Sequence, residues 1–132
     1  MKVLGSLLLA TVLLASAQEE ELRSVQSGVY TEEQAERGLK IFEGTCIACH
    51  QADEFSDGGY IDGWSGQTAS SMIDHIRDTM PQDSPGSLKR AEYVDVATYL
   101  FRLNGLPAGD TELDAESAKK IRIEGPFRPP SR

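Results

Sequence analysis

The sequence predicts an all-α domain of three to four helices, and three stretches of the chain support this fold class. Residues 31–34 read Thr-Glu-Glu-Gln, a capping-box pattern whose side chains bind free backbone N–H groups at the start of a helix. Residues 69–76 and 88–104 carry apolar side chains at the spacing of one helical face. These three stretches therefore predict the main helices.

The first predicted helix covers residues 31–43 and has a glycine near its middle. Ala35, Leu39 and Phe42 fall on one side of it, which is its expected buried face. Gly38 lowers the stability of a helix by about 1 kcal/mol relative to alanine. A glycine at this position therefore needs a packing reason.

The last predicted helix covers residues 88–104, before a glycine and a proline end it. We expect this helix to cross the first one closely, with Gly38 admitting the ring of Tyr99 or the branched side chain of Val96. Such a crossing would explain the glycine. The apolar positions that repeat at helical spacing are Tyr93, Val96, Ala97, Leu100 and Leu103.

Cys46, Cys49 and His50 form the pattern Cys-x-x-Cys-His, by which a c-type haem is attached. Two thiols three positions apart on one helical turn can reach the two vinyl groups of one porphyrin. The adjacent histidine then supplies an imidazole nitrogen to the iron. The sequence therefore predicts one haem c, bound covalently through Cys46 and Cys49, with His50 as an axial ligand.

Two other uses of a Cys-x-x-Cys pair are weaker alternatives. A zinc site needs about four ligands, and beyond this pattern the chain offers only His75 among its histidines and cysteines, at unsuitable spacing. A thioredoxin-like dithiol lies in a βαβ pattern, and none precedes Cys46. Both cysteines of the chain lie inside the pattern, so a structural disulfide elsewhere is excluded.

Met80 is the predicted second axial ligand, because carriers of electrons commonly place methionine opposite histidine on the iron. It precedes Pro81, which disfavours helix at the preceding residue, so the helix should end there and the thioether should project from a loop. Met72 falls in the apolar stripe of residues 69–76 and is expected in the core. His75 lies off that stripe as a solvated residue, with bis-histidine ligation left as an alternative.

The first residues have the features of a secretory signal peptide. Lys2 precedes an apolar run over residues 3–14, and Ala-Ser-Ala at 15–17 forms a cleavage site. The run is shorter than the roughly 20 residues that cross a bilayer. Covalent haem attachment takes place outside the bacterial cytoplasm, so we predict a periplasmic protein.

We expect four segments: a signal peptide at residues 1–17, a mobile leader at 18–28, a haem domain at 29–109 and a C-terminal extension at 110–132. In the extension, Ile121 and Ile123 alternate with charged residues like a short extended piece, and Gly125-Pro126 continues no regular element. This extension is expected to be disordered by default, with a path across the globule or a docking strap as alternatives.

From about Val29 to Gly109 the chain resembles the class I monohaem cytochromes c. In that family a first helix with Gly and Phe at the spacing of Gly38 and Phe42 crosses a last helix with an aromatic–Leu pair like Tyr99-Leu100. The resemblance implies the class I cytochrome c fold, with the N- and C-terminal helices crossing above one covalently attached haem.

A narrower similarity covers the second half of the domain. It is similar to small cytochromes c, and fused cytochrome domains, that accept electrons from quinoprotein dehydrogenases, which implies such a donor. The residues that carry this similarity are Met80-Pro81, Pro85-Gly86-Ser87-Leu88, Glu92-Tyr93-Val94-Asp95-Val96, Tyr99-Leu100, Asn104-Gly105 and Pro107-Ala108-Gly109.

The chain departs from many class I members at one place. They have a proline soon after the haem pattern, whose carbonyl accepts the proton of the ligand histidine, but residues 51–63 contain none. We therefore expect another carbonyl, near residues 57–59, to accept from His50 and tune its basicity.

Trp64, the only tryptophan, follows a Gly- and Asp-rich loop and has two interpretations. Its indole nitrogen donates to a haem propionate, or its ring is a half-buried anchor of the loop. Tyr60 has the same two interpretations, with the anchor favoured.

The chain has 21 acidic and 13 basic residues, a formal net charge of −8. This charge disfavours nucleic acid and anionic lipid, and either steers docking to a basic partner or serves solubility. We predict a monomeric, soluble periplasmic electron carrier, not an enzyme and not stably inserted in a membrane, between a dehydrogenase donor and an oxidase or cytochrome acceptor. A subunit held permanently in a dehydrogenase complex, and a haem enzyme or ligand sensor with an open iron position, are the alternatives. In so small a domain the haem is much of the core, so we expect the apo-protein to be poorly folded.

Overall fold

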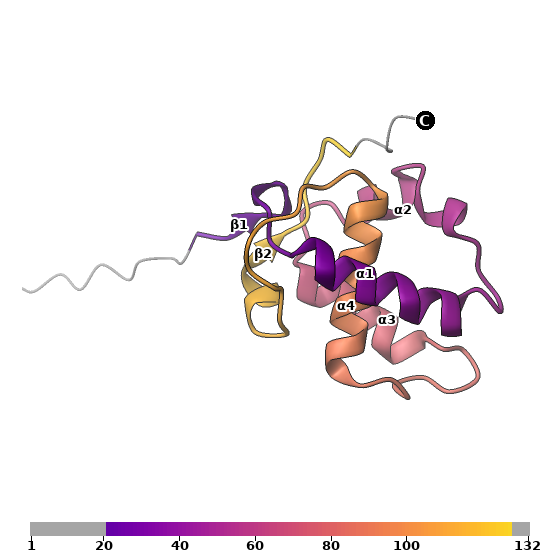
Figure 1. The fold of residues 1–132 in the computed structure, drawn as a ribbon. Helices are drawn as coiled ribbons and strands as arrows, with labels where there is room; N and C mark the ends of the chain where they lie inside the picture. The colour runs from indigo at the N-terminus through magenta and orange to yellow at the C-terminus, as the bar shows by residue number, and fades with distance from the viewer. Residues whose placement is uncertain (1–20, 128–132) are drawn as a thin grey trace, which may run out of the picture.

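The computed structural model describes residues 21–127 and is mostly helical, with the first long helix crossing the last (Figure 1). The predicted all-α fold is confirmed. The predicted signal peptide at residues 1–17 lies outside the described part of the chain. No helix between residues 21 and 127 has the length and apolar character needed to cross a membrane. The elements are β1 (Arg23–Ser24), α1 (Glu32–Ile41), α2 (Gly59–Asp62), α3 (Ala69–Thr79), α4 (Arg90–Leu103) and β2 (Ile121–Arg122).

Helix α1 begins where the capping pattern predicts. The Thr31 hydroxyl accepts a hydrogen bond from the backbone N–H of Gln34, at 3.2 Å. After α1 the chain continues in a wider π turn over Phe42–Cys46, in which the N–H of Ile47 donates to the carbonyl of Phe42 at 3.1 Å. This turn delivers the chain directly into the haem-attachment pattern.

Gly38 lies at the crossing of α1 and α4. A Cβ atom at Gly38 would overlap the backbone carbonyl of Asp95 and lie 2.9 Å from Cβ of Tyr99. The rings of Phe42 and Tyr99 then meet with centroids 5.2 Å apart. The predicted close crossing is confirmed, but the nearest atoms to Gly38 are the backbone of Asp95 and then Cβ of Tyr99, rather than the Tyr99 ring or the Val96 side chain.

Helix α3 has the predicted apolar face and the predicted end. The Thr68 hydroxyl caps its start by accepting from the N–H of Ser71 at 3.2 Å. Met72 and Ile73 are buried. The helix ends at Thr79, and Met80 follows in an extended conformation with φ −130° and ψ 150°.

The two ends of the described chain lie together, which differs from the mobile leader and disordered extension that we expected. Strands β1 and β2 pair in parallel, with Arg23 opposite Ile121. Val25 and Ile123 are both fully buried. Because Ile121 and Ile123 turn inward and β1 supplies backbone partners, the extension lies across the globule, one of the two alternatives. The segment boundaries themselves stay predictions.

A second contact ties the extension to the helix crossing. The buried amide of Gln34 donates to the carbonyl of Leu113 at 2.7 Å and accepts from the N–H of Leu113 at 2.8 Å. Arg37 pairs with Asp95 on α4 at 3.1 Å and with Glu112 at 2.8 Å. The extension is therefore bonded directly to α1, and Arg37 of α1 links Glu112 of the extension to Asp95 on α4.

The buried apolar side chains of residues 21–127 form two clusters, which we call the closed core and the open cluster. The closed core takes residues from both chain ends, α3 and α4. Only Phe42, Tyr99 and Leu100 are buried in the open cluster, and the apolar side chains packed around them are partly exposed. The members of this half-covered rim are Leu39, Cys46, Ala52, Phe55, Tyr60, Ile76 and Leu103.

Candidate haem site

The two cysteines and the histidine of the attachment pattern share one tight turn. The carbonyl of Cys46 accepts from the N–H of Cys49 at 3.1 Å and from the N–H of His50 at 2.9 Å. Both thiols are free. Cys46 packs against the open cluster, and burial raises the pKa of its thiol, whereas Cys49 is exposed. The turn therefore presents one thiol to the apolar cluster and one to solvent.

The imidazole of His50 is held by a carboxylate. Its Nδ1 lies 3.1 Å from Oε2 of Glu54, and its ring meets the ring of Phe55 edge-on with centroids 5.3 Å apart. An ionised carboxylate only accepts hydrogen bonds, so Nδ1 carries a proton, and in the neutral ring Nε2 then keeps its lone pair. This is the tautomer in which Nε2 can bind iron.

Our prediction of a carbonyl partner near residues 57–59 is wrong. A 3-10 helix over Ala52–Phe55 turns the chain back on itself, and this brings Glu54 to the imidazole first. The other oxygen of Glu54 accepts from the N–H of Gln51 at 2.8 Å. The Gln51 N–H and then His50 hold the pKa of the Glu54 carboxyl below its usual range.

Met80 is presented by a loop that is fixed to α4. It is half-buried, and its carbonyl accepts from the buried Tyr93 hydroxyl at 2.8 Å. The same hydroxyl accepts from the N–H of Leu88 at 3.4 Å. The competing Met72 is fully buried in the closed core, as expected for a core residue. The assignment of Met80 as an iron ligand stays a prediction.

Trp64 is half-buried and packs against the closed core, with its ring 5.3 Å from that of the exposed His75. Burial raises the pKa of the Tyr60 hydroxyl above its usual value, and a hydrogen bond with the Trp64 side chain offsets part of this rise. These are contacts of a loop anchor. The contact between Trp64 and a propionate stays a prediction, as does ligation by His75.

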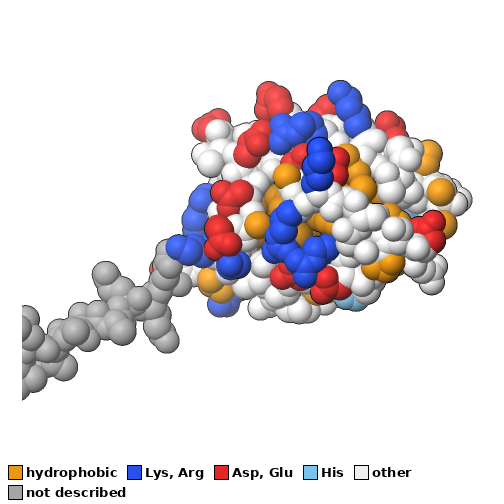
Figure 2. Space-filling model, turned by 90° about the horizontal axis from the view of Figure 1, so that it is seen from below, with side chains coloured by type: hydrophobic (Ala, Val, Ile, Leu, Met, Phe, Trp, Pro, Cys, Tyr) orange, Lys and Arg blue, Asp and Glu red, His pale blue; other side chains and the backbone are white. Residues whose placement is uncertain are grey.

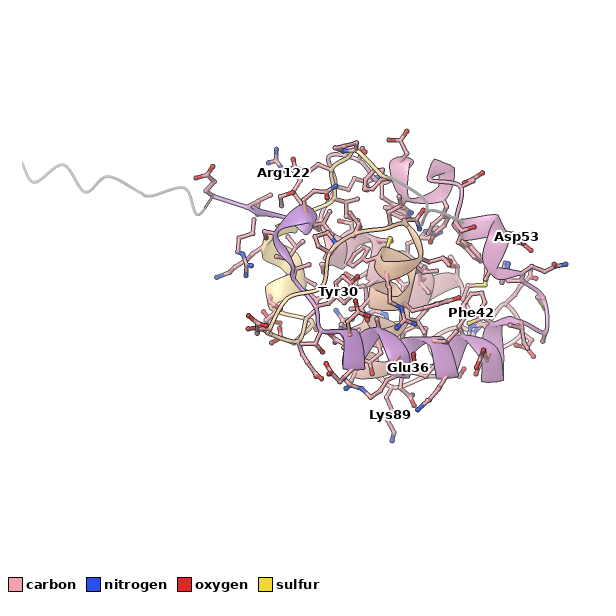
Figure 3. The ribbon with its side chains drawn as sticks, turned by 45° about the horizontal axis from the view of Figure 1, so that its top comes forward. Tyr30, Glu36, Phe42, Asp53, Lys89 and Arg122 are labelled. Carbon is pink, nitrogen blue, oxygen red and sulfur yellow. The ribbon has the colours of Figure 1, made fainter. Side chains whose placement is uncertain are left out.

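The residues present fit a covalently bound haem. The half-covered rim of the open cluster is an apolar wall that no segment within residues 21–127 completes, and a haem has large apolar faces. Ile47, which lies between the two cysteines, is 56% exposed and is the large apolar side chain left uncovered in the described chain. In Figure 3 Phe42 and Asp53 lie together at one end of the molecule, with Arg122 toward the other.

Sequence reasoning missed three residues that support this site. Glu54 and Tyr93 hold the two predicted ligands. The buried amide of Asn104 donates to the carbonyl of Phe55 at 2.7 Å and fixes the turn beside His50. The spacing of Gln51 and Glu54, which is that of a capping box, was the available signal for the first of these residues.

The comparisons with known proteins agree with this geometry. Residues 33–100 match the family model described as cytochrome c oxidase, cbb3-type, subunit III. No curated protein and no solved structure matches the chain. Domains of this family carry covalently bound haem c and transfer electrons rather than act as enzymes. The attachment turn, the crossing helices and the family match agree, and the chain belongs to this family of c-type cytochromes.

Proposed function

We propose that this protein is a periplasmic single-haem electron carrier, with thioether bonds from Cys46 and Cys49 and axial ligation by His50 and Met80. One observation carries the proposal: His50 has its Nδ1 directed at the Glu54 carboxylate, which leaves Nε2 of the neutral ring for the iron, on the turn that holds both thiols. When bound, the haem supplies a one-electron couple.

In this proposal the side chains hold and shield the redox group without chemistry on a substrate. The two thiols bind it covalently, and the open cluster covers part of it and keeps water away. Met80 comes from a loop that Tyr93 fixes at its carbonyl. Because each ligand is held by a second residue, little rearrangement should accompany a change of charge at the iron.

For the partners, we propose a quinoprotein dehydrogenase as donor and an oxidase or another cytochrome as acceptor. The similarity of residues 80–109 to carriers of that kind supports the donor. Figure 2 shows one face on which Lys and Arg side chains lie among Asp and Glu side chains, with apolar side chains between them. Such a mixed surface suits a short-lived contact between redox proteins.

The ligand assignment is tested by absorption spectroscopy of the haem-loaded protein. We expect a low-spin ferric spectrum with the methionine-to-iron charge-transfer band. Met80→Ala should lose this band and bind carbon monoxide readily in the ferrous form. Met72→Leu conserves core volume and should keep the band, as a matched control. A band that survives in Met80→Ala would overturn the assignment.

A permanent subunit of a larger complex is the second candidate, and the family description favours it because it names an oxidase subunit. Purification from the native host distinguishes the two. A free carrier elutes alone and is reduced by an added quinoprotein dehydrogenase in stopped-flow mixing, whereas a subunit elutes with its complex. N-terminal sequencing of the periplasmic fraction tests cleavage after Ala17.

A further inference from the structure

The proposed iron ligand His50 has an unusual neighbour in this fold: an acidic side chain rather than a backbone carbonyl. The Nδ1 of His50 and Oε2 of Glu54 are 3.1 Å apart, and the two residues lie on successive turns of the chain. A neutral carbonyl and a carboxylate differ by a full negative charge. This difference acts on the imidazole and, through it, on whatever the imidazole binds.

Glu54 is held in place by backbone bonds. Its second oxygen accepts from the N–H of Gln51 at 2.8 Å, which fixes the side chain at both oxygens. The next residue, Phe55, is fixed at its carbonyl by the buried amide of Asn104 at 2.7 Å and touches the His50 ring edge-on. The position of the carboxylate is therefore set by the fold and does not depend on a chance rotamer.

We propose that Glu54 is a positioning residue that orients His50 for the haem iron and lowers the reduction potential of the bound haem. This inference rests on the proposed function, because it takes His50 as an axial ligand. The carboxylate accepts the Nδ1 proton, which fixes the tautomer and makes Nε2 a stronger electron donor. A stronger donor and a nearby negative charge both stabilise ferric iron more than ferrous iron, and this lowers the reduction potential.

The expected effect is moderate because the pair is partly hydrated. The His50 side chain is 31% exposed and that of Glu54 is 48% exposed, so water screens part of the charge. We expect Glu54→Gln to raise the ferrous-to-ferric ratio about tenfold at a fixed solution potential, which is about 59 mV for a one-electron couple. Glutamine keeps the shape of the side chain and can still accept from the Gln51 N–H.

Asp53→Asn is the matched control for this experiment. It removes one negative charge from the neighbouring exposed residue, whose side chain has no bond to His50 among those described. Equilibrium redox titrations of the three haem-loaded proteins should give a change of less than about threefold for Asp53→Asn. A shift in Glu54→Gln that is no larger than in the control, or a ratio within twofold of the wild type, would overturn the proposal.

A second readout covers the case in which the variant folds poorly. In the diamagnetic ferrous wild-type protein, nitrogen-resolved NMR should show a His50 Nδ1 proton that exchanges slowly with water. Its absence would overturn the role of Glu54. The charge-transfer band separates this inference from the ligand assignment: an intact band with an unchanged potential refutes only the role of Glu54, and a missing wild-type band refutes the ligation.

Discussion

The closed core and the open cluster share helix α4 but differ in what covers them. Val25 from one chain end and Ile121 and Ile123 from the other seal the closed core with protein. The open cluster has three buried residues and a half-covered apolar rim. The difference separates two tasks: the chain ends supply a self-sufficient core, and the haem completes the other side. We therefore now expect the apo-protein to be poorly folded only around the open cluster, and the closed core to stay folded without haem.

The largest effect should follow from removing the haem. We expect Cys46→Ala/Cys49→Ala to lose order over residues 46–60 while amides around β1, β2 and the first half of α4 stay protected. Hydrogen exchange measured by mass spectrometry checks this pattern. The variant Ile47→Ala, in the same turn with both thiols intact, is the control. Equal loss of protection in both regions would show that the two clusters depend on each other fully.

Truncation in the closed core should cost stability without touching the haem site. Ile123→Ala removes a fully buried side chain and should lower the free energy of unfolding by about 3 kcal/mol. Chemical denaturation of the haem-loaded protein measures this change. The absorption spectrum of the folded variant should equal that of the wild type. A changed spectrum would mean that the closed core also shapes the iron site.

Gly38→Ala tests the crossing that joins the two clusters. A methyl group there would overlap the Asp95 carbonyl, and we expect a loss of about 2 kcal/mol despite the better helix propensity of alanine. Gly44→Ala is the control, because a Cβ at Gly44 has no neighbour within 4 Å. Thermal melts of both variants give the comparison. Equal melting temperatures would contradict the close packing of α1 on α4.

Two buried tyrosines allow the same chemical change in each region. Tyr93→Phe removes the donor to the Met80 carbonyl, and Tyr30→Phe removes the donor to the Leu106 carbonyl in the closed core. Each should cost about 1 kcal/mol. Only Tyr93→Phe should lose the charge-transfer band on heating before the protein unfolds. If Tyr30→Phe does the same, the loop at Met80 has no separate anchor.

The smallest effect concerns pH and the extension. Arg37 lowers the pKa of the Glu112 carboxyl below its usual value of 4.5. Because the folded-state pKa of Glu112 is lowered, the ion pair stabilises the folded protein at pH values above the unfolded-state pKa of 4.5. This stabilisation is lost as the pH falls through the lower folded-state pKa. Glu112→Gln should therefore lose stability less steeply with acid than the wild type. Trp64 fluorescence during denaturation at several pH values checks this, and parallel curves would refute it.

Local signals in the sequence predicted the helices and the proposed ligands. The cap at Thr31 and the Met80-Pro81 junction each act within a few residues, and the attachment pattern is contiguous. The structure also confirmed the close crossing at Gly38, because a glycine inside an amphipathic helix calls for a partner. These features needed no knowledge of distant contacts.

The features that were missed depend on distant partners or on weak patterns. Strands β1 and β2 have two residues each, too few for an alternating pattern, and pair across almost the whole described chain. The reach of Gln34 to Leu113 is equally nonlocal. Glu54 is local to His50, but several acidic residues follow the haem pattern, and only the turn at Ala52–Phe55 selects one of them.

The pairing of β1 with β2 also decides how the protein can be tethered. The described chain starts next to β1, and Arg122, in β2, lies toward the end of the molecule away from Phe42 and Asp53 (Figure 3). A surface anchor or a fused enzyme attached before Leu22 would therefore hold the carrier at the end of the molecule away from Phe42 and Asp53. The attachment turn would still face outward, and the linker length would set the effective concentration of the carrier at its partner.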